Sequence, residues 1–315
     1  MLVTTGGRPG LTIIEAPSNL GLKPPVPGKE PGVRRLPEAL AKAGLPAAVA
    51  ARWGGRVAPP AYSHEVDPAT GIRNAPAIAR YSADLAEAVG EAIDRGAFPV
   101  VLGGDCSILL GNLLALRRRG RFGLFFADGH ADFASPQTSP SQGAAGMDLS
   151  LSTGRGPAAL ANLDGLGPLV RDEDVVILAF RDEEPLPRAI AAHRVAELRS
   201  VGIRETVRRE IARLRAGGVR GFWIHLDADV LDPELFPAVD TPESGGLLLE
   251  ELAELLEELL ASDLAAGMQV CIYDPDLDPE GRCARDLAGV VAAAFGQAEV
   301  RGRPSGLRSG VGVSG

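Results

Sequence analysis

The sequence predicts an α/β fold in which helices cover both faces of a mainly parallel sheet. Short apolar, β-branched runs alternate with longer helical patterns along the chain, and this alternation is typical of parallel sheets. Aspartates directly follow two of these runs, and such sheets bind ligands at the carboxyl ends of their strands. No repeat or linker divides the 315 residues, so we expect one domain over 1–315, with a flexible tail from about 296 to 315.

Each predicted strand is a short run of mostly apolar residues, many of them Val, Ile, Leu or Phe. Runs that are apolar on both faces fit strands buried in the middle of a sheet. The predicted strands are residues 11–15, 99–102, 122–127, 175–180, 221–226 and 269–273.

The predicted helices lie between these strands. The segment 247–260, LLLEELAELLEELL, has a broad leucine face and a glutamate face, as expected of a helix that packs on a core. Two connections have loop composition: 22–32 is rich in proline, and 133–146, rich in Ser, Pro, Gln and Ala, should wall any site at the strand ends. The predicted helices are residues 75–95, 108–118, 203–216, 247–261 and 285–295.

Composition excludes several classes of function. The net charge of −9 argues against nucleic acid as the main partner, because such a surface needs clustered Lys and Arg. No apolar run approaches the roughly 18 residues of a membrane-spanning helix, and the first residues lack a signal-peptide pattern, so we expect a cytoplasmic protein. The cysteines, Cys106, Cys271 and Cys283, are three and form no Cys-x-x-Cys pair, which excludes a zinc-finger pattern and disfavours a disulfide framework. We interpret Cys271 and Cys283 as small core residues.

Two strand ends carry groups that bind metals. Residues two apart on a strand face the same way, so Asp128, His130 and Asp132 form one set and Asp227 and Asp229 another. Carboxylates with an imidazole suit Mn²⁺, Mg²⁺ or Zn²⁺, and this excess of carboxylates suggests two ions. In the alternative interpretation, Asp128 caps a turn and the later Asp-Pro pair only ends a strand.

Three motifs in this order resemble the ureohydrolase (arginase/agmatinase) family: GGDCS at 103–107, DGHAD at 128–132 and DADVLDP at 227–233. The resemblance continues through Thr241-Pro242 and 245–247, and so covers roughly residues 95–280. It implies a three-layer α/β/α fold, two divalent metal ions, usually Mn²⁺, a small-molecule substrate, and a homo-oligomer, often a trimer or hexamer.

The resemblance also implies a role for each ligand. Asp128 and Asp227 would bridge the ions, Asp132 would join them at one ion, and His130 and Asp229 at the other. A water held between two divalent ions loses its proton near neutral pH and can attack a planar carbon such as that of guanidinium. The expected reaction is hydrolysis of a C–N bond that yields urea, or formamide from formimino substrates.

The chain departs from the family pattern at its first motif and in the loop after the second. Cys106 stands where the family has a metal-ligand histidine, and a softer thiolate would favour Zn²⁺, Fe²⁺ or Ni²⁺; alternatively Cys106 is a buried thiol beside a one-metal site. Gapless counting places Ala145 at the family's proton-shuttle histidine and Ala134 at the asparagine that holds the amino acid's carboxylate. These changes argue against ordinary L-arginase activity.

Three acidic residues are candidates for the missing roles. Asp148 is a candidate proton shuttle, or else a residue that caps a loop. Gapless counting places Ile272 at the family's guanidinium-binding carboxylate, and a shift of two residues brings in Asp274, which we predict to bind substrate and contribute to catalysis. Glu184 resembles the acidic position that contacts the substrate's amino group, although acidic residues also commonly follow strands.

Two histidines and two alternative functions complete the sequence-based predictions. We expect His193 on the surface in a helical stretch, and His225 as a hydrogen-bonded strand residue or as a group that orients a metal ligand. The main hypothesis is a binuclear metallohydrolase of a small guanidino or amidino compound. The alternative is a non-catalytic relative that holds one metal for a structural or ligand-sensing role. A deacetylase is disfavoured because the sequence has no His-His pair.

Overall fold

The computed structural model describes residues 10–301. Within that range eight strands form one sheet in the order β2-β1-β3-β8-β7-β4-β5-β6, and every neighbouring pair is parallel. The strands are β1 (Leu11–Glu15), β2 (Arg52–Arg56), β3 (Phe98–Leu102), β4 (Gly123–Ala127), β5 (Val175–Phe180), β6 (Ala191–Arg194), β7 (Phe222–Asp227) and β8 (Ala265–Cys271).

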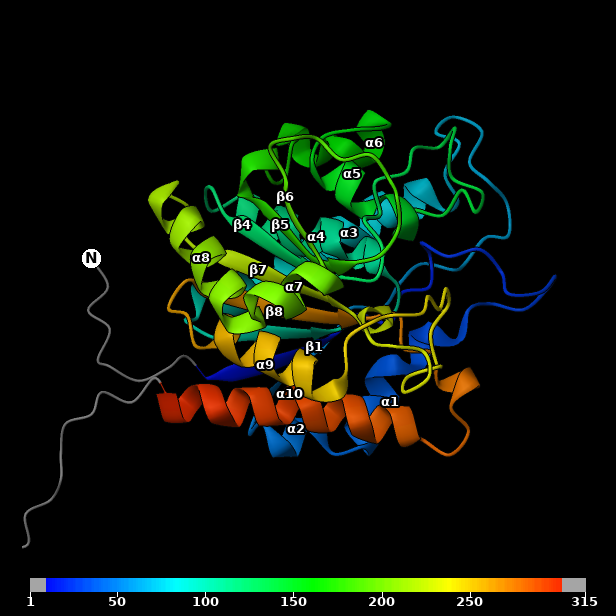
Figure 1. Ribbon diagram of the computed structural model, residues 1–315. Helices are drawn as coiled ribbons and strands as arrows, with labels where there is room; N and C mark the ends of the chain where they lie inside the picture. Colours follow the sequence, from blue (N-terminus) through cyan, green and yellow to red (C-terminus); the bar gives the residue numbers. More distant parts are fainter. Residues whose placement is uncertain (1–9, 302–315) are drawn as a thin grey trace, which may run out of the picture.

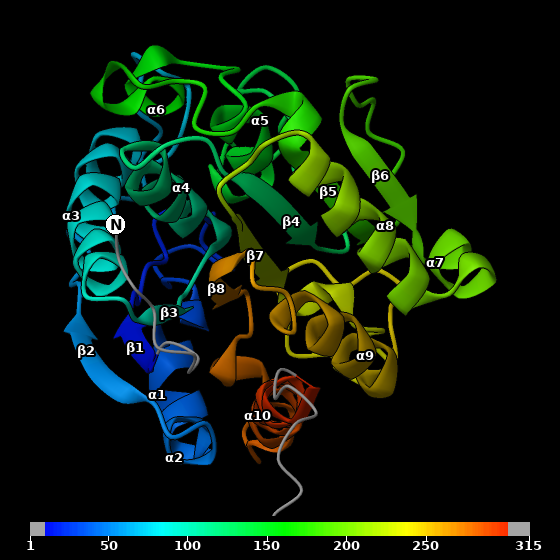
Figure 2. The ribbon, with the colours of Figure 1, turned by 90° about the vertical axis from the view of Figure 1, so that its left-hand side faces the viewer.

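Helices cover both faces of the sheet and make three layers (Figure 1). On one side pack α3, α4, α5 and α6, and on the other α1, α9 and α10, as the rotated view also shows (Figure 2). The helices are α1 (Leu36–Lys42), α2 (Leu45–Ala48), α3 (Ala75–Asp94), α4 (Leu109–Arg117), α5 (Asp148–Ser152), α6 (Ala158–Ala161), α7 (Val195–Val201), α8 (Ile203–Ala216), α9 (Leu249–Leu260) and α10 (Arg282–Arg301).

The core divides into two apolar clusters because side chains alternate across each strand. On β4, for example, Phe125 joins one cluster and Phe126 joins the cluster on the opposite face. Both phenylalanines are fully buried. The runs of uninterrupted apolar residues in the sequence therefore reflect a sheet that is buried on both faces.

The predicted α/β/α fold is confirmed, and the structure refines its elements. The strands β2 and β6 were missed: RWGGR and AAHR lack apolar runs because both lie at the sheet edges. The predicted tail begins too early, since α10 continues to Arg301, and the remaining tail residues, 302–315, lie outside the described range. None of the described helices is long and apolar enough to cross a membrane.

The strand order brings together segments that are distant in the sequence. The four central strands, β3, β8, β7 and β4, are neighbours, and their registers align Leu102 with Val270, and Ala127 with Leu226. Asp227 at the end of β7 is paired with Cys271 at the end of β8. The motifs that follow β3, β4 and β7 therefore meet at one edge of the sheet.

Candidate metal centre

A tight turn after β3 places Cys106 at this edge. Asp105 accepts hydrogen bonds from the Ser18 hydroxyl (2.6 Å) and from the Ser107 backbone N–H (2.9 Å), which fixes the start of the 3₁₀ helix Cys106–Ile108. Gly104 packs directly on the Ser18 carbonyl, where a side chain would collide. The Gly-Gly-Asp sequence is thus the local reason why the Cys106 thiol is held in place.

Short turns orient the aspartates at the ends of β4 and β7. Asp128 Oδ1 accepts the His130 backbone N–H at 2.7 Å, and Asp227 Oδ1 accepts the Asp229 backbone N–H at 2.7 Å. The His130 side chain contacts the same aspartates: its Nδ1 lies 2.9 Å from Asp229 Oδ2. These contacts turn the carboxylates and the imidazole toward a common point.

Three groups of side chains have ligand atoms within 4.8 Å of one another. Two of them share Asp128, as expected of a bridging residue, whereas Asp227, the other predicted bridging residue, occurs in one group only. The groups are Cys106, Asp128 and Asp132; Asp128, His130 and Asp229; and Cys106, His225, Asp227 and Cys271. All six predicted metal ligands therefore fall into these groups, together with two residues, His225 and Cys271, that were not predicted as ligands.

Several buried oxygens in this region lack a partner. Among the described residues, Asp128 Oδ2 and both carboxylate oxygens of Asp148 have no hydrogen bond, although these side chains are at most 1% exposed. Burial and mutual repulsion raise the pKa of Asp128, Asp132, Asp148 and Asp227 well above the ordinary value. Unpaired buried carboxylates are costly, so this donor set fits divalent cations, which would neutralise it.

The pair formed by His130 and Asp229 differs from the other carboxylates. Burial alone would lower the pKa of His130, but its hydrogen bond to Asp229 and the surrounding carboxylates raise it to about 9. Burial likewise opposes ionisation of Asp229, yet the contact with His130 lowers the pKa of this carboxyl overall. Glu243, which sequence reasoning missed, lies with Oε2 3.5 Å from His130 Nε2. Its only signal in the sequence is that it follows Thr241-Pro242.

Two thiols meet at the centre. Cys106 Sγ lies 3.1 Å from Cys271 Sγ and donates to Asp227 Oδ2 at 2.8 Å. Burial is the main reason that the pKa of Cys106 lies well above its ordinary value and that of Cys271 is raised to about 11. The interpretation of Cys271 as a simple core residue is therefore incomplete, because its thiol faces the predicted ligands.

A chain of hydrogen bonds fixes the tautomer of His225. The Trp223 indole N–H donates to Gln269 Oε1 at 3.0 Å, so the Gln269 amide nitrogen faces and donates to His225 Nδ1 at 2.9 Å. Since burial lowers the pKa of His225 to about 3, the ring is neutral and its proton is on Nε2, 3.4 Å from Asp128 Oδ2. His225 therefore orients a ligand from behind, one of the two predicted roles.

The predicted substrate and proton-transfer residues lie in different surroundings. Asp148 begins α5 and is completely buried. Glu184 is half-buried and accepts the Phe133 backbone N–H at 2.9 Å, so it holds the loop after β4. Asp274 accepts the Asp276 backbone N–H at 2.8 Å and caps a 3₁₀ turn, and it belongs to none of the three groups above.

The structure corrects the prediction for His193. This residue lies on β6, not in a helix, and is 7% exposed. Its Nδ1 is 3.0 Å from Glu197 and its Nε2 is 3.2 Å from Glu210. No local pattern predicted this burial, because the partners of His193 come from α7 and α8.

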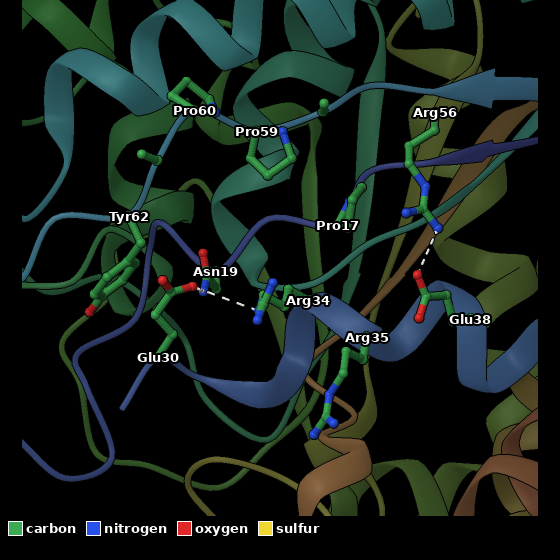
Figure 3. Close-up of a pocket in the computed structure, with 12 residues that line it drawn as sticks. Pro17, Asn19, Glu30, Arg34, Arg35, Glu38, Arg56, Pro59, Pro60 and Tyr62 are labelled. Atoms are coloured by element: carbon green, nitrogen blue, oxygen red, sulfur yellow. Dashed lines mark hydrogen bonds and ion pairs between the residues drawn. The ribbon is translucent and has the colours of Figure 1, made fainter. Parts of the chain in front are cut away.

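A surface cavity of about 530 Å³ lies beside β1 and β2 (Figure 3). Its arginines are already paired, for example Arg56 with Glu15 and Glu38, and Arg35 with Asp276. None of the predicted metal ligands lines this cavity. It is therefore separate from the metal-ligand groups.

The comparisons with known proteins agree with this geometry. The arginase family model matches residues 11–296. The arginase of Bacillus caldovelox is 31% identical over 233 residues, covering 72% of this chain and 78% of that protein, and the arginase of Brevibacillus brevis is 33% identical, covering 67% and 73%. The solved structure of the Bacillus caldovelox arginase has a TM-score of 0.81 at 29% identity and covers 91% of this chain and 98% of that one.

More distant structures share the fold alone. Proclavaminate amidino hydrolase from Streptomyces clavuligerus has a TM-score of 0.70 at 19% identity, with 93% of each chain covered. The family match over nearly the whole described range, together with the three motifs at the strand ends, leads to one conclusion: this chain belongs to the arginase family.

Proposed function

We propose that the protein is a metal-dependent hydrolase of a C–N bond in a small guanidino or amidino compound other than L-arginine. The observation that carries the proposal is the buried carboxylate of Asp128, whose Oδ2 has no hydrogen bond within the described residues and which is shared by two groups of potential metal ligands. Family membership supports hydrolysis of this class of bond. The absence of the shuttle histidine at Ala145 and of the asparagine at Ala134 motivates the exclusion of L-arginine.

The ligands divide into two positions. Cys106 and Asp132 belong to one position, His130 and Asp229 belong to the other, and Asp128 and Asp227 serve both. We propose two divalent ions, Mn²⁺ by family resemblance, or Zn²⁺, Fe²⁺ or Ni²⁺ where the thiol binds. When bound, such ions supply a water of lowered pKa and polarise the substrate carbon.

The remaining acidic residues suit a cationic substrate. Glu243 lies beside His130. Glu184 lies in the segment after β5 and accepts a hydrogen bond from Phe133, in the loop after β4. Burial, together with nearby carboxylates that include Asp274, raises the pKa of Asp240. We propose that Glu184 and Asp274 attract and orient the substrate cation.

Asp148, with two unpartnered oxygens, would carry the proton that Ala145 cannot move. We further propose that the protein acts in the cytoplasm as a homo-oligomer.

A substrate panel tests this function. Protein freed of metal and reconstituted with Mn²⁺ or Zn²⁺ would be incubated with L-arginine, agmatine, other guanidines and formimino compounds, and release of urea, ammonia and formamide measured. We expect metal-dependent turnover of a compound other than L-arginine, which Asp128→Asn abolishes. L-Arginine as the best substrate would contradict the specificity, and two bound ions without turnover on any compound would contradict hydrolysis.

A second candidate is a non-catalytic relative with one structural metal. Two apolar residues favour it: Ala145 is 5% exposed at the shuttle position, and Ile272 is 4% exposed at the position of the guanidinium-binding carboxylate. One tightly held ion per chain, with no turnover on the same panel, would support this candidate. Two ions with turnover would exclude it.

A further inference from the structure

The two thiols of the centre come from segments 165 residues apart in the sequence. Cys106 begins the 3₁₀ helix after β3, and Cys271 is the last residue of β8. The neighbouring positions of β3 and β8 bring their sulfurs to 3.1 Å, and both side chains are at most 1% exposed. The Cys106 thiol also contacts Asp227 Oδ2 at 2.8 Å. Two sulfurs and a carboxylate oxygen therefore face one another in a closed space.

The third cysteine provides a comparison within the same chain. Cys283 lies near the start of α10, is also buried, and packs in the apolar cluster under that helix. It belongs to none of the groups of potential metal ligands, whereas Cys106 and Cys271 share one with Asp227 and His225. Burial alone therefore does not explain the position of the Cys106–Cys271 pair.

The donor types select a class of ion. Thiolate sulfur prefers soft or borderline ions such as Zn²⁺, whereas Mn²⁺ and Mg²⁺ prefer oxygen. The group formed by Asp128, His130 and Asp229 contains no sulfur. The two ends of the centre thus differ in chemical softness.

The sulfur end of the centre is the group of Cys106, His225, Asp227 and Cys271. Hydrogen bonding decides how many of these residues can act as metal ligands. His225 accepts from Gln269 at Nδ1, so its Nε2 bears a proton and is a donor, not a ligand. Turning the Gln269 amide would free this nitrogen, but it would also place an N–H group against the Trp223 indole N–H. Within the group of Cys106, His225, Asp227 and Cys271, the remaining potential ligand atoms are Cys106 Sγ, Cys271 Sγ and Asp227 Oδ2. Three protein ligands and an open fourth position are typical of catalytic zinc sites.

We propose that Cys106 and Cys271 bind a Zn²⁺ ion together, with Asp227, at the sulfur end of the centre, so that Cys271 takes the place given above to Asp132 and to the bridging Asp128 at that ion, while Asp128, His130 and Asp229 hold a harder ion such as Mn²⁺. Binding of Zn²⁺ displaces one proton from each thiol to solvent. The inference rests on the metal centre of the proposed function, and it does not depend on which substrate is hydrolysed.

Cobalt substitution tests the two thiolate ligands directly. Co²⁺ replaces Zn²⁺ and gives an intense near-ultraviolet charge-transfer absorption only when thiolate is bound. Reduced, metal-free wild-type protein would be titrated with Co²⁺ and compared with Cys106→Val, Cys271→Val and, as a matched buried-thiol control, Cys283→Val. We expect the absorption per bound cobalt to fall to about half in each of the first two variants, since one of two thiolates is lost, and to be unchanged in the control.

Competition between metals provides a second measurement. We expect Cys271→Val to weaken Zn²⁺ binding by at least about 10-fold and to leave Mn²⁺ binding unchanged, as measured by calorimetry. Circular dichroism checks the folding of each variant. If Cys271→Val does not fold, Cys271→Ser replaces it, because a hydroxyl retains the size of the side chain without a thiolate.

The outcomes separate this inference from the proposed function. Bound cobalt without the charge-transfer absorption, or an absorption that is unchanged in the Cys271 variants, overturns the two-thiolate site and leaves the hydrolase proposal intact. A Cys106–Cys271 disulfide that persists in reductant, seen by intact mass, also overturns it. If wild-type protein binds neither Co²⁺, Zn²⁺ nor Mn²⁺, the metal centre itself fails, and both proposals fail with it.

Discussion

Two buried clusters of charged residues in this protein differ in how their charges are balanced. In the cluster of His193, Glu210 and Arg213, the two oxygens of Glu210 face His193 and the Arg213 guanidinium, and Arg213 also donates to two backbone carbonyls. In the metal centre, oxygens of Asp128 and Asp148 have no partner among the described residues. The charges of the first cluster are balanced by residues of the protein itself, whereas the donor set of the second fits a cation.

The same contrast appears in the carboxyl pKa values. Burial opposes ionisation of Glu210, but hydrogen bonds from His193 and Arg213 lower its pKa to about 2. Burial and neighbouring carboxylates raise the pKa of Asp128 and Asp227 well above the ordinary value. Acidic residues that are equally buried therefore serve opposite purposes, and the partners of each one distinguish structure from function.

The largest effect should come from Asp128→Asn. Removal of the shared ligand should lower metal-dependent activity by more than about 100-fold and abolish the rise in melting temperature on metal addition. The metal-free protein should become no less stable, because a neutral amide replaces a carboxyl that is buried beside other carboxylates. Calorimetry with and without metal measures both effects.

The control for this variant is Asp263→Asn, which changes an exposed carboxylate paired with Arg215. It should alter neither metal binding nor activity. A clear loss of stability in metal-free Asp128→Asn, with metal binding retained, would show that Asp128 is a structural residue.

A smaller effect, on stability alone, is expected for Glu210→Gln. Loss of this charge leaves His193 and Arg213 without their buried partner and should lower the free energy of unfolding by about 2 kcal/mol. Urea denaturation measures the change. Metal content, measured by elemental analysis, should stay that of the wild type. Loss of metal in this variant would show that Glu210 also supports metal binding, and would contradict the contrast between the two clusters.

The smallest effect is the pH dependence of that stability difference. Because the pKa of Glu210 is lowered from 4.5 to about 2, its contribution is full above pH 4.5 and is lost as the pH falls toward 2. Burial opposes protonation of His193, but Glu210 and Glu197 raise its pKa above 6.5, so its contribution is full below pH 6.5 and is lost at higher pH. Arg209 and Arg213 also face Glu210.

The difference between wild type and Glu210→Gln should therefore be greatest between pH 4.5 and 6.5. Urea denaturation at pH 3, 5.5 and 8 provides the test. A difference that is constant over this range would mean that the cluster contributes through packing instead of charge.

The sequence predicted the fold well where apolar residues dominate. Strands such as β5, with six buried residues in succession, were found because both of their faces are covered. The edge strands β2 and β6 were missed because they contain few fully buried residues and therefore lack an apolar run. The convergence of Asp128, His130 and Asp229 was predictable, because Asp128 and His130 lie two residues apart after β4 and Asp229 lies two residues after Asp227 at the end of β7.

The rest of the site depends on contacts between distant segments. Cys271 lies 165 residues from Cys106, and no local pattern distinguishes it from a core cysteine such as Cys283. Glu243 was likewise missed, and His193 was wrongly predicted to lie on the surface, because their partners belong to other elements. Asp274 was chosen by counting along the chain, but the position of its carboxylate is decided by the turn that it caps.

The place of β8 in the sheet has a consequence for the order of assembly. This strand follows every other described strand in the sequence, yet it lies between β3 and β7 at the centre of the sheet. A growing polypeptide therefore cannot join the two halves of its sheet until residues 265–271 have left the ribosome. Long-range parallel pairing of this kind is slow, so the candidate metal centre, which draws residues from both halves of the sheet, is among the last parts of the described fold to form.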